Sequence, residues 1–420
     1  MIIIKKSICI ILTVILALSS LAVFSFAADV GTTGTFNVIN YNIAGLPIPA
    51  SMAGHNRDAL SDDVLIGKKI NEAKFDIVGV QEDFNFDQYF RAELTNYENV
   101  TSGSTVKECH QSETSGGVPS GDGLNIFSLY NLYNIKRVEW KESMDSFDSN
   151  GDGNASIGEL EGDSLTPKGF MVATIEPEKG YYIDVYDLHA DAFGGESYQI
   201  RAKQFTQLAN YIMKHSVYDE TTGCYDHGVI VVGDFNAFIM EEGNTNSDSK
   251  LLPNLIEAAH LNDAWAVNTL ENISENVSDK NYSYRPYYDY VKTMAGVTNI
   301  WDESTGLIGH YDSIERILYA SGNGIKISLT DKGDSFKYEN WKNEEGYSLS
   351  DHCNAQAKFT YTIVDKVQDT SSSHDSTTTP QRTGFLFKFL KAIGSLLETL
   401  GRIFQLPGFE QAAKKLMKGG

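Results

Sequence analysis

Residues 228–236 read GVIVVGDFN, a short apolar run that closes on polar residues, and this stretch decides the fold class. Valine and isoleucine in a run of this length, bounded by glycine, predict a buried β-strand. Residues 76–81 (DIVGVQ) have the same character, and residues 181–189 (YYIDVYDLH) form a strand that also ends in polar residues. Residues 35–42 (TFNVINYN) alternate apolar and polar side chains, as a half-buried strand does. We therefore predict a sheet-based domain whose strands end in polar side chains.

Helical segments lie between these strands without a regular order. Residues 62–74 and 201–215 have helical periodicity, and further strands are expected near residues 314–319 and 355–363. Strict β-α-β units would alternate helix and strand throughout, which this chain does not do. The predicted fold class is therefore a mixed α/β (α+β) domain with layered sheets.

The first 27 residues are typical of an export signal. Lys5 and Lys6 give a positive start, residues 7–24 are almost entirely apolar or small, and residues 25–27 (SFA) form a small-residue cleavage site. The alternative is a retained membrane anchor, because the apolar run nearly reaches spanning length. We favour cleavage and expect a secreted, extracellular protein.

The composition changes again near the C-terminus. Residues 366–384 are rich in serine and threonine and have no apolar period, which predicts a linker. Residues 385–420 then predict a basic amphipathic helix. We expect this helix to lie on an anionic membrane surface; the alternative is a helix whose apolar stripe packs on the main domain or on itself.

The formal net charge of the chain is −22, although both ends are net basic. An acidic body repels polyphosphate, so a nucleic-acid substrate is less favoured. After the apolar leader only three cysteines remain, Cys109, Cys224 and Cys353, so one disulfide at most can form and its pairing stays open. Their spacing fits no zinc site. We expect a monomer.

Several polar residues follow strands in a way that suggests a common site: Asn42, Glu82, His189, Asp234, Asn236, Asp351 and His352. Strand ends at one edge of a layered sheet converge on a cleft. Carboxylate and amide oxygens suit Mg²⁺, Mn²⁺ or Ca²⁺, and such an ion neutralises phosphate charge. A histidine beside an aspartate can act as a general base. Taken singly, each of these residues is more often a loop residue, a helix cap or a structural histidine.

The ordered series YN, QE, LH, GDFN and SDH resembles the endonuclease/exonuclease/phosphatase superfamily, which includes deoxyribonuclease I and the neutral sphingomyelinases. The resemblance covers about residues 35–362. The segments YNIAGLP, DIVGVQEDFN, GDGLNIFS, LTPKGF and ERILY look like a branch of secreted bacterial and fungal members. The resemblance implies a four-layer α-β-β-α sandwich of the deoxyribonuclease I type, and it assigns residues 28–365 to a catalytic domain.

The resemblance also implies residue roles and a cofactor, Mg²⁺ or Mn²⁺. Glu82 matches the main metal-ligand glutamate of the superfamily, and Asn42 matches an asparagine near the metal and the phosphate. Asp351 matches an aspartate that orients the base or binds metal, and His352 matches the base that activates water.

The remaining matches concern the phosphate. His189 matches a histidine that contacts the phosphate and protonates the leaving group, and Asp234 and Asn236 match the pair that binds phosphate and positions the nucleophile. One position departs from the family pattern, because SIERILY has Glu315 where an aspartate is usual. Asp312 lies just before it; we favour Glu315 as the residue that enters the site, although it could simply face solvent.

Residues 147–160 (FDSNGDGNASIGEL) fit an EF-hand calcium loop. Gly153 permits the sharp turn, although Ala155 replaces the usual branched apolar residue. The oxygen ligands would be Asp148, Asn150, Asp152, Ser156 and Glu159. We favour bound Ca²⁺ over the alternative of an acidic surface insertion without an ion.

We therefore predict a secreted, divalent-metal-dependent phosphodiesterase in which a His-activated water attacks phosphorus with the help of the metal. Its substrate would be a phospholipid, a sphingolipid or a small phosphoester. One alternative is a secreted endonuclease on DNA or RNA. Another is a non-catalytic surface-binding module on the same fold, which the presence of the whole set of site residues disfavours.

Overall fold

A computed structural model gives the arrangement of most of the chain between Ala28 and Val367. Contacts divide the chain into two units, Met1–Val367 and Gln368–Gly420, and the described residues all belong to the first. The described ranges are 28–45, 58–84, 86–100, 114–115, 118–119, 121–143, 168–192, 197–237, 250–273, 313–331 and 334–367.

The first large sheet has the strand order β15-β17-β1-β2-β6-β3, with β16 also paired to β17. Its central strands, β1 and β2, are parallel, whereas β17 and β6 run antiparallel on either side of them. The strands of this sheet are β1 (Thr33–Asn42), β2 (Ile77–Gln81), β3 (Asn99–Val100), β6 (Asn125–Ser128), β15 (Ile325–Leu329), β16 (Phe336–Glu339) and β17 (Asn354–Ile363).

The second large sheet, in the order β13-β14-β12-β9-β8-β7, repeats this arrangement. The central pair β12 and β9 is parallel and is flanked by antiparallel β14 and β8. Its strands are β7 (Tyr133–Glu139), β8 (Gly169–Glu178), β9 (Tyr181–His189), β12 (Gly228–Asp234), β13 (Asn262–Asp263) and β14 (Glu315–Ala320). Two small ribbons are formed by β4 (Thr114–Ser115) with β5 (Val118–Pro119), and by β10 (Tyr218–Asp219) with β11 (Cys224–Tyr225).

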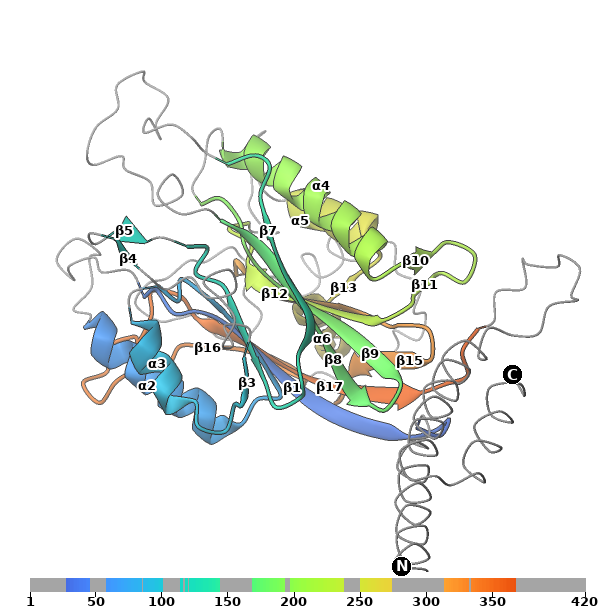
Figure 1. Ribbon diagram of the computed structural model, residues 1–420, viewed down its shortest axis with the longest axis horizontal. Helices are drawn as coiled ribbons and strands as arrows, with labels where there is room; N and C mark the ends of the chain where they lie inside the picture. The colour runs from blue at the N-terminus through green and yellow to red at the C-terminus, as the bar shows by residue number, and fades with distance from the viewer. Residues whose placement is uncertain are drawn as a thin grey trace, which may run out of the picture. The chain divides into compact units, whose positions relative to one another are not determined.

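Helices cover the outer faces of the paired sheets (Figure 1). Helix α2 (Ala59–Ala73) and helix α3 (Asp87–Glu93) pack on the first sheet, while α4 (Ser197–His215) and α5 (Leu251–Ala258) cover the second. Helix α6 (Ala264–Ile273) contacts β14 and β16. The predicted fold class, an α-β-β-α sandwich, is confirmed.

The alternation along β1 shows how the sequence sets these layers. Phe36 and Val38 belong to the core between the sheets, whereas Ile39 and Tyr41 pack in the smaller core beneath α2 and α3. Side chains of a strand point alternately to its two faces, so Asn40 and Asn42 share the side of Phe36 and Val38. Two amides therefore point into the space between the sheets, close to the end of the strand.

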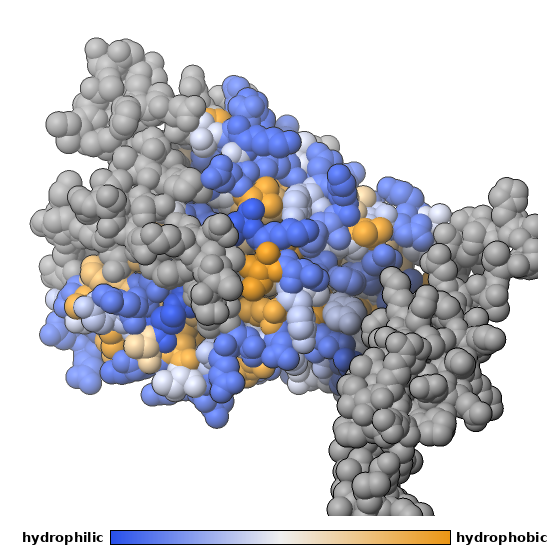
Figure 2. All heavy atoms as spheres, viewed as in Figure 1, coloured by the Kyte–Doolittle hydropathy of each residue, from blue (hydrophilic) through white to orange (hydrophobic). Residues whose placement is uncertain are grey.

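The predicted strands at 35–42, 76–81, 181–189 and 228–234 correspond to β1, β2, β9 and β12. Among the helices of the described ranges, none is both long enough and apolar enough to cross a bilayer. Figure 2 shows one face of the molecule, which is mostly hydrophilic where the structure describes it. The predicted leader (1–27), calcium loop (147–160) and C-terminal helix (385–420) lie outside the described residues, as does all of the predicted linker except its first two residues.

Candidate active site

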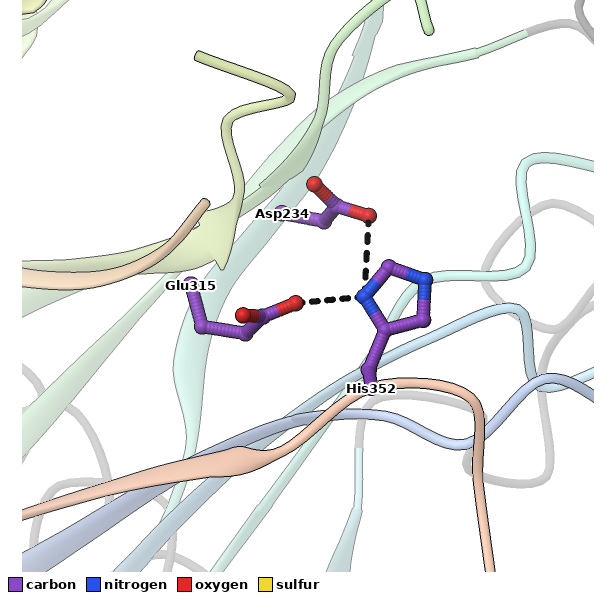
Figure 3. A group of neighbouring side chains, drawn as sticks. All are labelled: Asp234, Glu315 and His352. Carbon is purple, nitrogen blue, oxygen red and sulfur yellow. Dashed lines mark hydrogen bonds and ion pairs between the residues drawn. The ribbon is translucent and has the colours of Figure 1, made fainter. Parts of the chain in front are cut away.

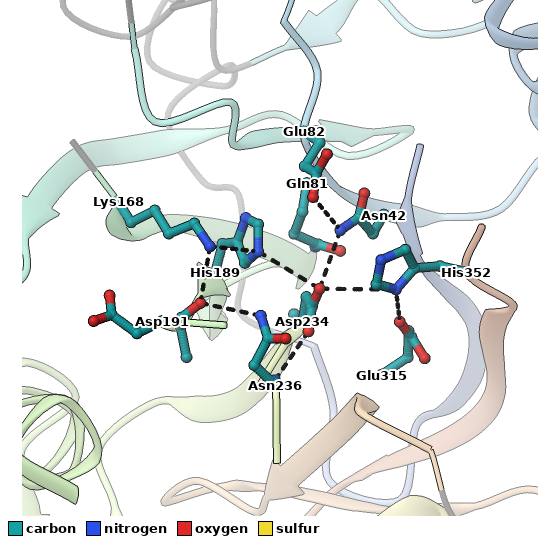
Figure 4. Close-up of polar contacts among 12 residues, drawn as sticks. Asn42, Gln81, Glu82, Lys168, His189, Asp191, Asp234, Asn236, Glu315 and His352 are labelled. Carbon is teal, nitrogen blue, oxygen red and sulfur yellow. Dashed lines mark hydrogen bonds and ion pairs between the residues drawn. The ribbon is translucent and has the colours of Figure 1, made fainter. Parts of the chain in front are cut away.

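Four strand ends carry polar side chains to one edge of the paired sheets. Asn42 is the last residue of β1, and Glu82 directly follows β2, which runs parallel to β1. His189 and Asp234 are the last residues of β9 and β12, the parallel pair of the other sheet. The side-chain amide of Asn42 bonds to Asp234 across the two sheets, so both pairs end at the same edge (Figure 4).

Two antiparallel strands reach this edge from the other direction. β14 begins at Glu315, which lies opposite Asp234 in the register of β12 and β14. β17 begins at Asn354, two residues after His352, and it runs antiparallel to β1. The start of an antiparallel strand lies beside the end of its neighbour, so Glu315 and His352 join the group.

Asp234 is at the centre of this group and is buried. Its Oδ2 atom accepts a hydrogen bond from Asn42 Nδ2 at 3.0 Å and lies 3.5 Å from His189 Nε2 and 3.8 Å from His352 Nδ1. Its Oδ1 atom accepts a hydrogen bond from the backbone N–H of Asn236 at 2.9 Å. One carboxylate therefore links groups from both sheets.

Burial raises the pKa of Asp234 to about 6, and the nearby charge of Glu315 acts in the same direction. His352 and the Asn42 amide oppose this shift, because both stabilise the carboxylate form. The centre of the site therefore holds a carboxylate whose protonation responds strongly to its neighbours.

His352 and Glu315 form a hydrogen-bonded pair (Figure 3). The Nδ1 atom of His352 lies 2.5 Å from Oε1 of Glu315, which is itself fully buried. The other carboxylate oxygen accepts a hydrogen bond from Ser313 Oγ and lies 3.7 Å from Cys353 Sγ. Both oxygens of Glu315 are thus engaged, which fixes the carboxylate and, through it, the imidazole ring.

The pKa of His352 is raised well above its ordinary value. Burial alone would lower it, but the negative charges of Glu315, Asp351 and Asp234 outweigh burial. The Nε2 atom lies 3.8 Å from Oδ1 of Asp351, whose side chain is exposed. With Nδ1 committed to Glu315, Nε2 is the nitrogen that can exchange a proton with a bound molecule.

Ser350 fastens the loop that carries Asp351 and His352. Its buried hydroxyl donates to the backbone carbonyl of Asn42 at 2.7 Å and accepts from the backbone N–H of His352 at 3.1 Å. The loop before β17 is therefore tied directly to the end of β1.

Glu82 adopts a left-handed backbone conformation with φ of 55°. Its carbonyl oxygen accepts hydrogen bonds from the N–H groups of Gly45 and Phe84, both at 2.9 Å, and its Oε1 atom accepts from Asn42 Nδ2 at 2.9 Å. A β-carbon on Gly45 would lie 2.6 Å from that carbonyl oxygen, so only glycine allows this approach. Non-glycine residues rarely adopt this conformation, and those that do are concentrated at functional sites.

His189 is buried and contacts a lysine. Its Nε2 atom lies 3.0 Å from Lys168 Nζ, while its backbone carbonyl accepts a hydrogen bond from Trp140 Nε1 at 2.8 Å. Lys168 Nζ also donates to the carbonyl of Ala190 at 3.2 Å. Burial, and then the positive charge of Lys168, hold the pKa of His189 well below its ordinary value. His189 is therefore neutral, with Nε2 accepting from the ammonium group.

The structure brings most of the predicted site residues into one group: Asn42, Glu82, His189, Asp234, Asn236, Glu315, Asp351 and His352. Glu315 enters the site, whereas the alternative residue, Asp312, lies outside the described residues. The same holds for the predicted calcium ligands Asp148, Asn150, Asp152, Ser156 and Glu159.

Three residues of the site and its surroundings were not predicted: Lys168, Ser350 and Gln81. Lys168 alone carried a usable signal, because it directly precedes the apolar run GFMVATI of β8, where a charged residue is unusual. Ser350 and Gln81 act through contacts with residues distant in sequence, which no local pattern displays.

Two groups of side chains could hold a metal ion. Asp234, Glu315 and His352 offer ligand atoms within 4.8 Å of one another, but His352 and Glu315 are already bonded to each other. At Glu82 the pKa of the carboxyl is raised by burial and then by the negative charge of Asp351. A cation would relieve this crowding of carboxylates, and their oxygens, with that of Asn42, are the donors that Mg²⁺ or Mn²⁺ prefers. Of the two groups, the one that fits a divalent cation better is therefore Glu82, Asp351 and Asn42.

No family model matches this chain. In sequence it is similar to curated sphingomyelinases of Mycobacterium bovis and Mycobacterium tuberculosis, with 28% identity over 337 residues, or 80% of this chain and 54% of theirs. The chain thus spans about half the length of the curated relatives it matches. The neutral sphingomyelinases are among the proteins that the motifs resemble, so this similarity confirms the predicted resemblance.

Solved structures to which this chain is similar include a beta toxin variant from Staphylococcus aureus with bound magnesium ions (TM-score 0.44, 17% identity, 77% of this chain and 99% of that chain). Sphingomyelinase C from Streptomyces griseocarneus has a TM-score of 0.42 at 14% identity, again over 77% of this chain and 99% of its own. TDP2 from D. rerio, complexed with a single-strand DNA product, has a TM-score of 0.45 at 15% identity, over 78% and 99%.

Proposed function

We propose that this chain is a divalent-metal-dependent phosphodiesterase that hydrolyses a P–O bond of a phospholipid or sphingolipid, or of a small phosphoester. The observation that carries the proposal is the contact of Asp234 with Asn42, His189 and the His352–Glu315 pair, since these five groups come from five strand ends or starts. The sequence similarity to curated sphingomyelinases supports it.

In this proposal His352 is the general base. Glu315 accepts the Nδ1 hydrogen and fixes the tautomer, so Nε2 can take a proton from water. Asp234 and Asn236, joined by a hydrogen bond of 2.9 Å between Asp234 Oδ1 and the Asn236 N–H, position that water and the phosphate. General-base catalysis of this kind contributes about 10²- to 10⁴-fold to the rate.

On the other side of Asp234, His189 and Lys168 handle the leaving group. The neutral imidazole of His189 accepts from the Lys168 ammonium at 3.0 Å, so the proton for the leaving oxygen starts on Lys168. It passes to Nε2 of His189, and the imidazolium so formed donates a proton to the leaving oxygen, which leaves Lys168 as the neutral amine. The ammonium also brings positive charge to the phosphate, in a buried place where charge acts strongly.

Glu82, Asp351 and Asn42 would hold the metal. When bound there, Mg²⁺ or Mn²⁺ would offset the phosphate charge, polarise the P–O bond and counter the negative charges that raise the pKa of His352.

A lipid or small phosphoester is preferred over nucleic acid because the chain is strongly acidic, with a net charge of −22. The apolar leader at residues 1–27 supports export, and the basic amphipathic segment at 385–420 supports attachment to an anionic membrane. Both are proposals from the sequence, as are the EF-hand-like calcium loop at 147–160, the Ser/Thr-rich linker at 366–384 and the monomeric state.

The test is hydrolysis by the full mature chain, offered sphingomyelin vesicles, phosphatidylcholine vesicles, bis(p-nitrophenyl) phosphate and plasmid DNA, each with Mg²⁺ and with chelator. We expect metal-dependent release of phosphate esters from the lipids or the small diester. Efficient cleavage of plasmid DNA in preference to both would favour the endonuclease alternative. Turnover of none of them would support a binding module, and full turnover in chelator would exclude a metal-dependent enzyme.

A further inference from the structure

Beneath the candidate site, three buried polar side chains lie in the space between the two sheets. Asn40 comes from β1, Gln81 from β2 and Asp187 from β9, and each is fully buried. The mechanism proposed above uses none of them. Polar groups in such a place are costly unless they are hydrogen-bonded, so their contacts call for an explanation.

The contacts join all four central strands. Gln81 Nε2 donates to Asn40 Oδ1 at 2.8 Å and to Asp187 Oδ1 at 2.6 Å. Asn40 Nδ2 donates to the carbonyl of Gly233 in β12 at 2.8 Å. The hydrogen bonds to Asp187 and to Gly233 both cross from the first sheet to the second, and Gln81 is the residue through which they connect.

The sheets approach each other closely at this point. Gly79 lies two residues before Gln81 in β2, and a β-carbon there would meet Val232 of β12 at 2.3 Å and Asp187 at 3.5 Å. Glycine therefore permits the approach that brings the polar side chains within hydrogen-bonding distance.

Each member of the network lies one or two residues before a residue of the site. Asn40 precedes Asn42, Gln81 precedes Glu82, Asp187 precedes His189 and Gly233 precedes Asp234. A shift of one strand relative to another at the network would therefore move a site residue by a similar amount.

Apolar packing between sheets is not directional and tolerates small shifts, whereas hydrogen bonds fix both distance and direction. We propose that Gln81 is a positioning residue for the candidate active site: with Asn40 and Asp187 it clamps the ends of β1, β2, β9 and β12 to one another and so aligns the groups that carry the chemistry. This inference rests on the proposed function for its catalytic consequence, although the clamp itself does not.

Gln81→Met tests the clamp, because methionine has a similar size and shape but donates no hydrogen bond. We expect kcat to fall by on the order of tenfold to a hundredfold, since displacements of about 1 Å in an active site cost up to ~10²-fold. We expect KM to change less than about twofold. The fold should persist with a lowered Tm, because the buried acceptor oxygens of Asn40 and Asp187 lose the donor that Gln81 supplies.

Two further variants distinguish positioning from general damage. Asp187→Asn keeps the oxygen that accepts from Gln81 and should retain most of the wild-type kcat. Thr174→Val is the matched control, since it removes a buried hydrogen bond of 2.7 Å to Asp184, a β9 residue outside the clamp, and should leave kcat unchanged. A loss in Asp187→Asn equal to that in Gln81→Met would overturn the clamp, because charge rather than hydrogen bonding would then matter.

Amide hydrogen exchange provides a readout that does not depend on activity. The N–H of Ile43 donates to the carbonyl of Gln81 and that of Ala190 to the carbonyl of Asp234, both at 3.0 Å. In Gln81→Met the exchange rate of both amides should rise by a larger factor than that of core amides that exchange only through global unfolding. Unchanged exchange together with unchanged kcat would refute the proposal.

If Gln81→Met does not fold, Gln81→Met combined with Asp187→Leu leaves no carboxyl group unpaired, and the same two readouts apply to it. If the wild-type chain hydrolyses no phosphodiester, the proposed function fails and amide exchange alone decides whether the clamp exists.

Discussion

In the Glu315–His352 pair, one imidazole nitrogen, Nδ1, is bonded to the carboxylate. The proton transfer of the proposed general base therefore takes place at Nε2. We predict that His352→Ala lowers kcat by about 10³-fold or more, within the range that loss of a general base gives. Glu315→Gln keeps an acceptor oxygen for Nδ1 but removes the negative charge, so its kcat should fall less than that of His352→Ala. His260→Ala, an exposed histidine outside the site that stacks on Tyr218, is the control. Near-normal turnover in folded His352→Ala would rule out this base.

In the proposed function, Glu82 is the residue whose charge matters most for the metal. Glu82→Gln keeps the size of the side chain but removes the negative charge that a divalent cation requires. We predict that the Mg²⁺ or Mn²⁺ concentration for half-maximal activity rises by about tenfold or more, with partial recovery at high metal. The measurement is activity titrated with metal after chelation. An unchanged metal requirement would place the ion at other residues.

At the scale of elements, the strands that end in the site were the ones best predicted. β9 and β12 are apolar runs with glycine or polar residues at their ends, and β1 alternates clearly, so local periodicity was sufficient. β7 (YNIKRVE) was not predicted because it is a polar edge strand with little alternation. Helix α5 (LLPNLIEA) was missed because it has only eight residues and contains a proline.

The site was predictable to the same extent and for the same reason. Asn42, Glu82, His189 and Asp234 follow or end recognisable strands, and the order of their motifs along the chain carries the family resemblance. Lys168 belongs to the site only because β8 is paired beside β9, an arrangement that tertiary packing determines.

The far part of β9 carries a partly buried ion pair, Asp184 with His227, that should make stability depend on pH. Asp184 accepts hydrogen bonds from Thr174 and Ser216. It also lies 3.1 Å from Nδ1 of His227, the residue directly before β12. Burial would raise the pKa of Asp184, but His227 together with the hydrogen bonds from Thr174 and Ser216 outweighs burial, and the pKa is lowered. The hydrogen bond to Asp184 raises the pKa of His227.

The signs of these shifts define the expected pH window. A histidine whose pKa is raised in the folded state stabilises the fold at pH values below its unfolded pKa of about 6.5. This stabilisation is lost as the pH rises through the folded pKa. An aspartate whose pKa is lowered in the folded state stabilises the fold at pH values above its unfolded pKa of about 3.9. This stabilisation is lost as the pH falls through the folded pKa. We predict that His227→Gln lowers the free energy of unfolding by about 1 kcal/mol at pH 5.5 and by less at pH 8.5, given the partial exposure of the ring. Urea unfolding at both pH values measures this, and an equal loss at both would contradict it.

The predicted calcium loop at residues 147–160 is an element that can be tested separately. A ligand that binds only the folded state raises Tm by mass action, so millimolar Ca²⁺ should raise Tm by about 2 °C or more. Asp148→Ala combined with Asp152→Ala should abolish that rise. The control is a substitution of two acidic residues elsewhere, Glu344→Ala with Glu345→Ala, which should leave the rise in Tm intact. A calcium effect that persists in the first pair would mean that the ion binds elsewhere.

At the scale of the whole molecule, charge and apolar surface are separated along the chain. The acidic majority would be repelled by an anionic membrane, whereas residues 385–420 combine lysines and arginines with an apolar stripe that a Ser/Thr-rich linker cannot cover. A truncation should come after Val367, because residues 366–367 still contact the main domain: Val367 is hydrogen-bonded to Asn323, and Lys366 lies over the ring of Tyr181.

We predict that truncation after Val367 leaves the hydrolysis of a soluble phosphodiester unchanged, since every residue assigned to the chemistry lies before it. The same truncation should abolish binding to vesicles that contain anionic lipid and slow the hydrolysis of lipid in those vesicles. In the full chain, Lys388→Glu with Lys391→Glu should weaken vesicle binding in the same way, because the attraction is partly electrostatic and falls with added salt. Loss of soluble-substrate activity on truncation would make the tail part of the catalytic domain. Undiminished sedimentation with vesicles would place the membrane-binding surface within residues 28–367.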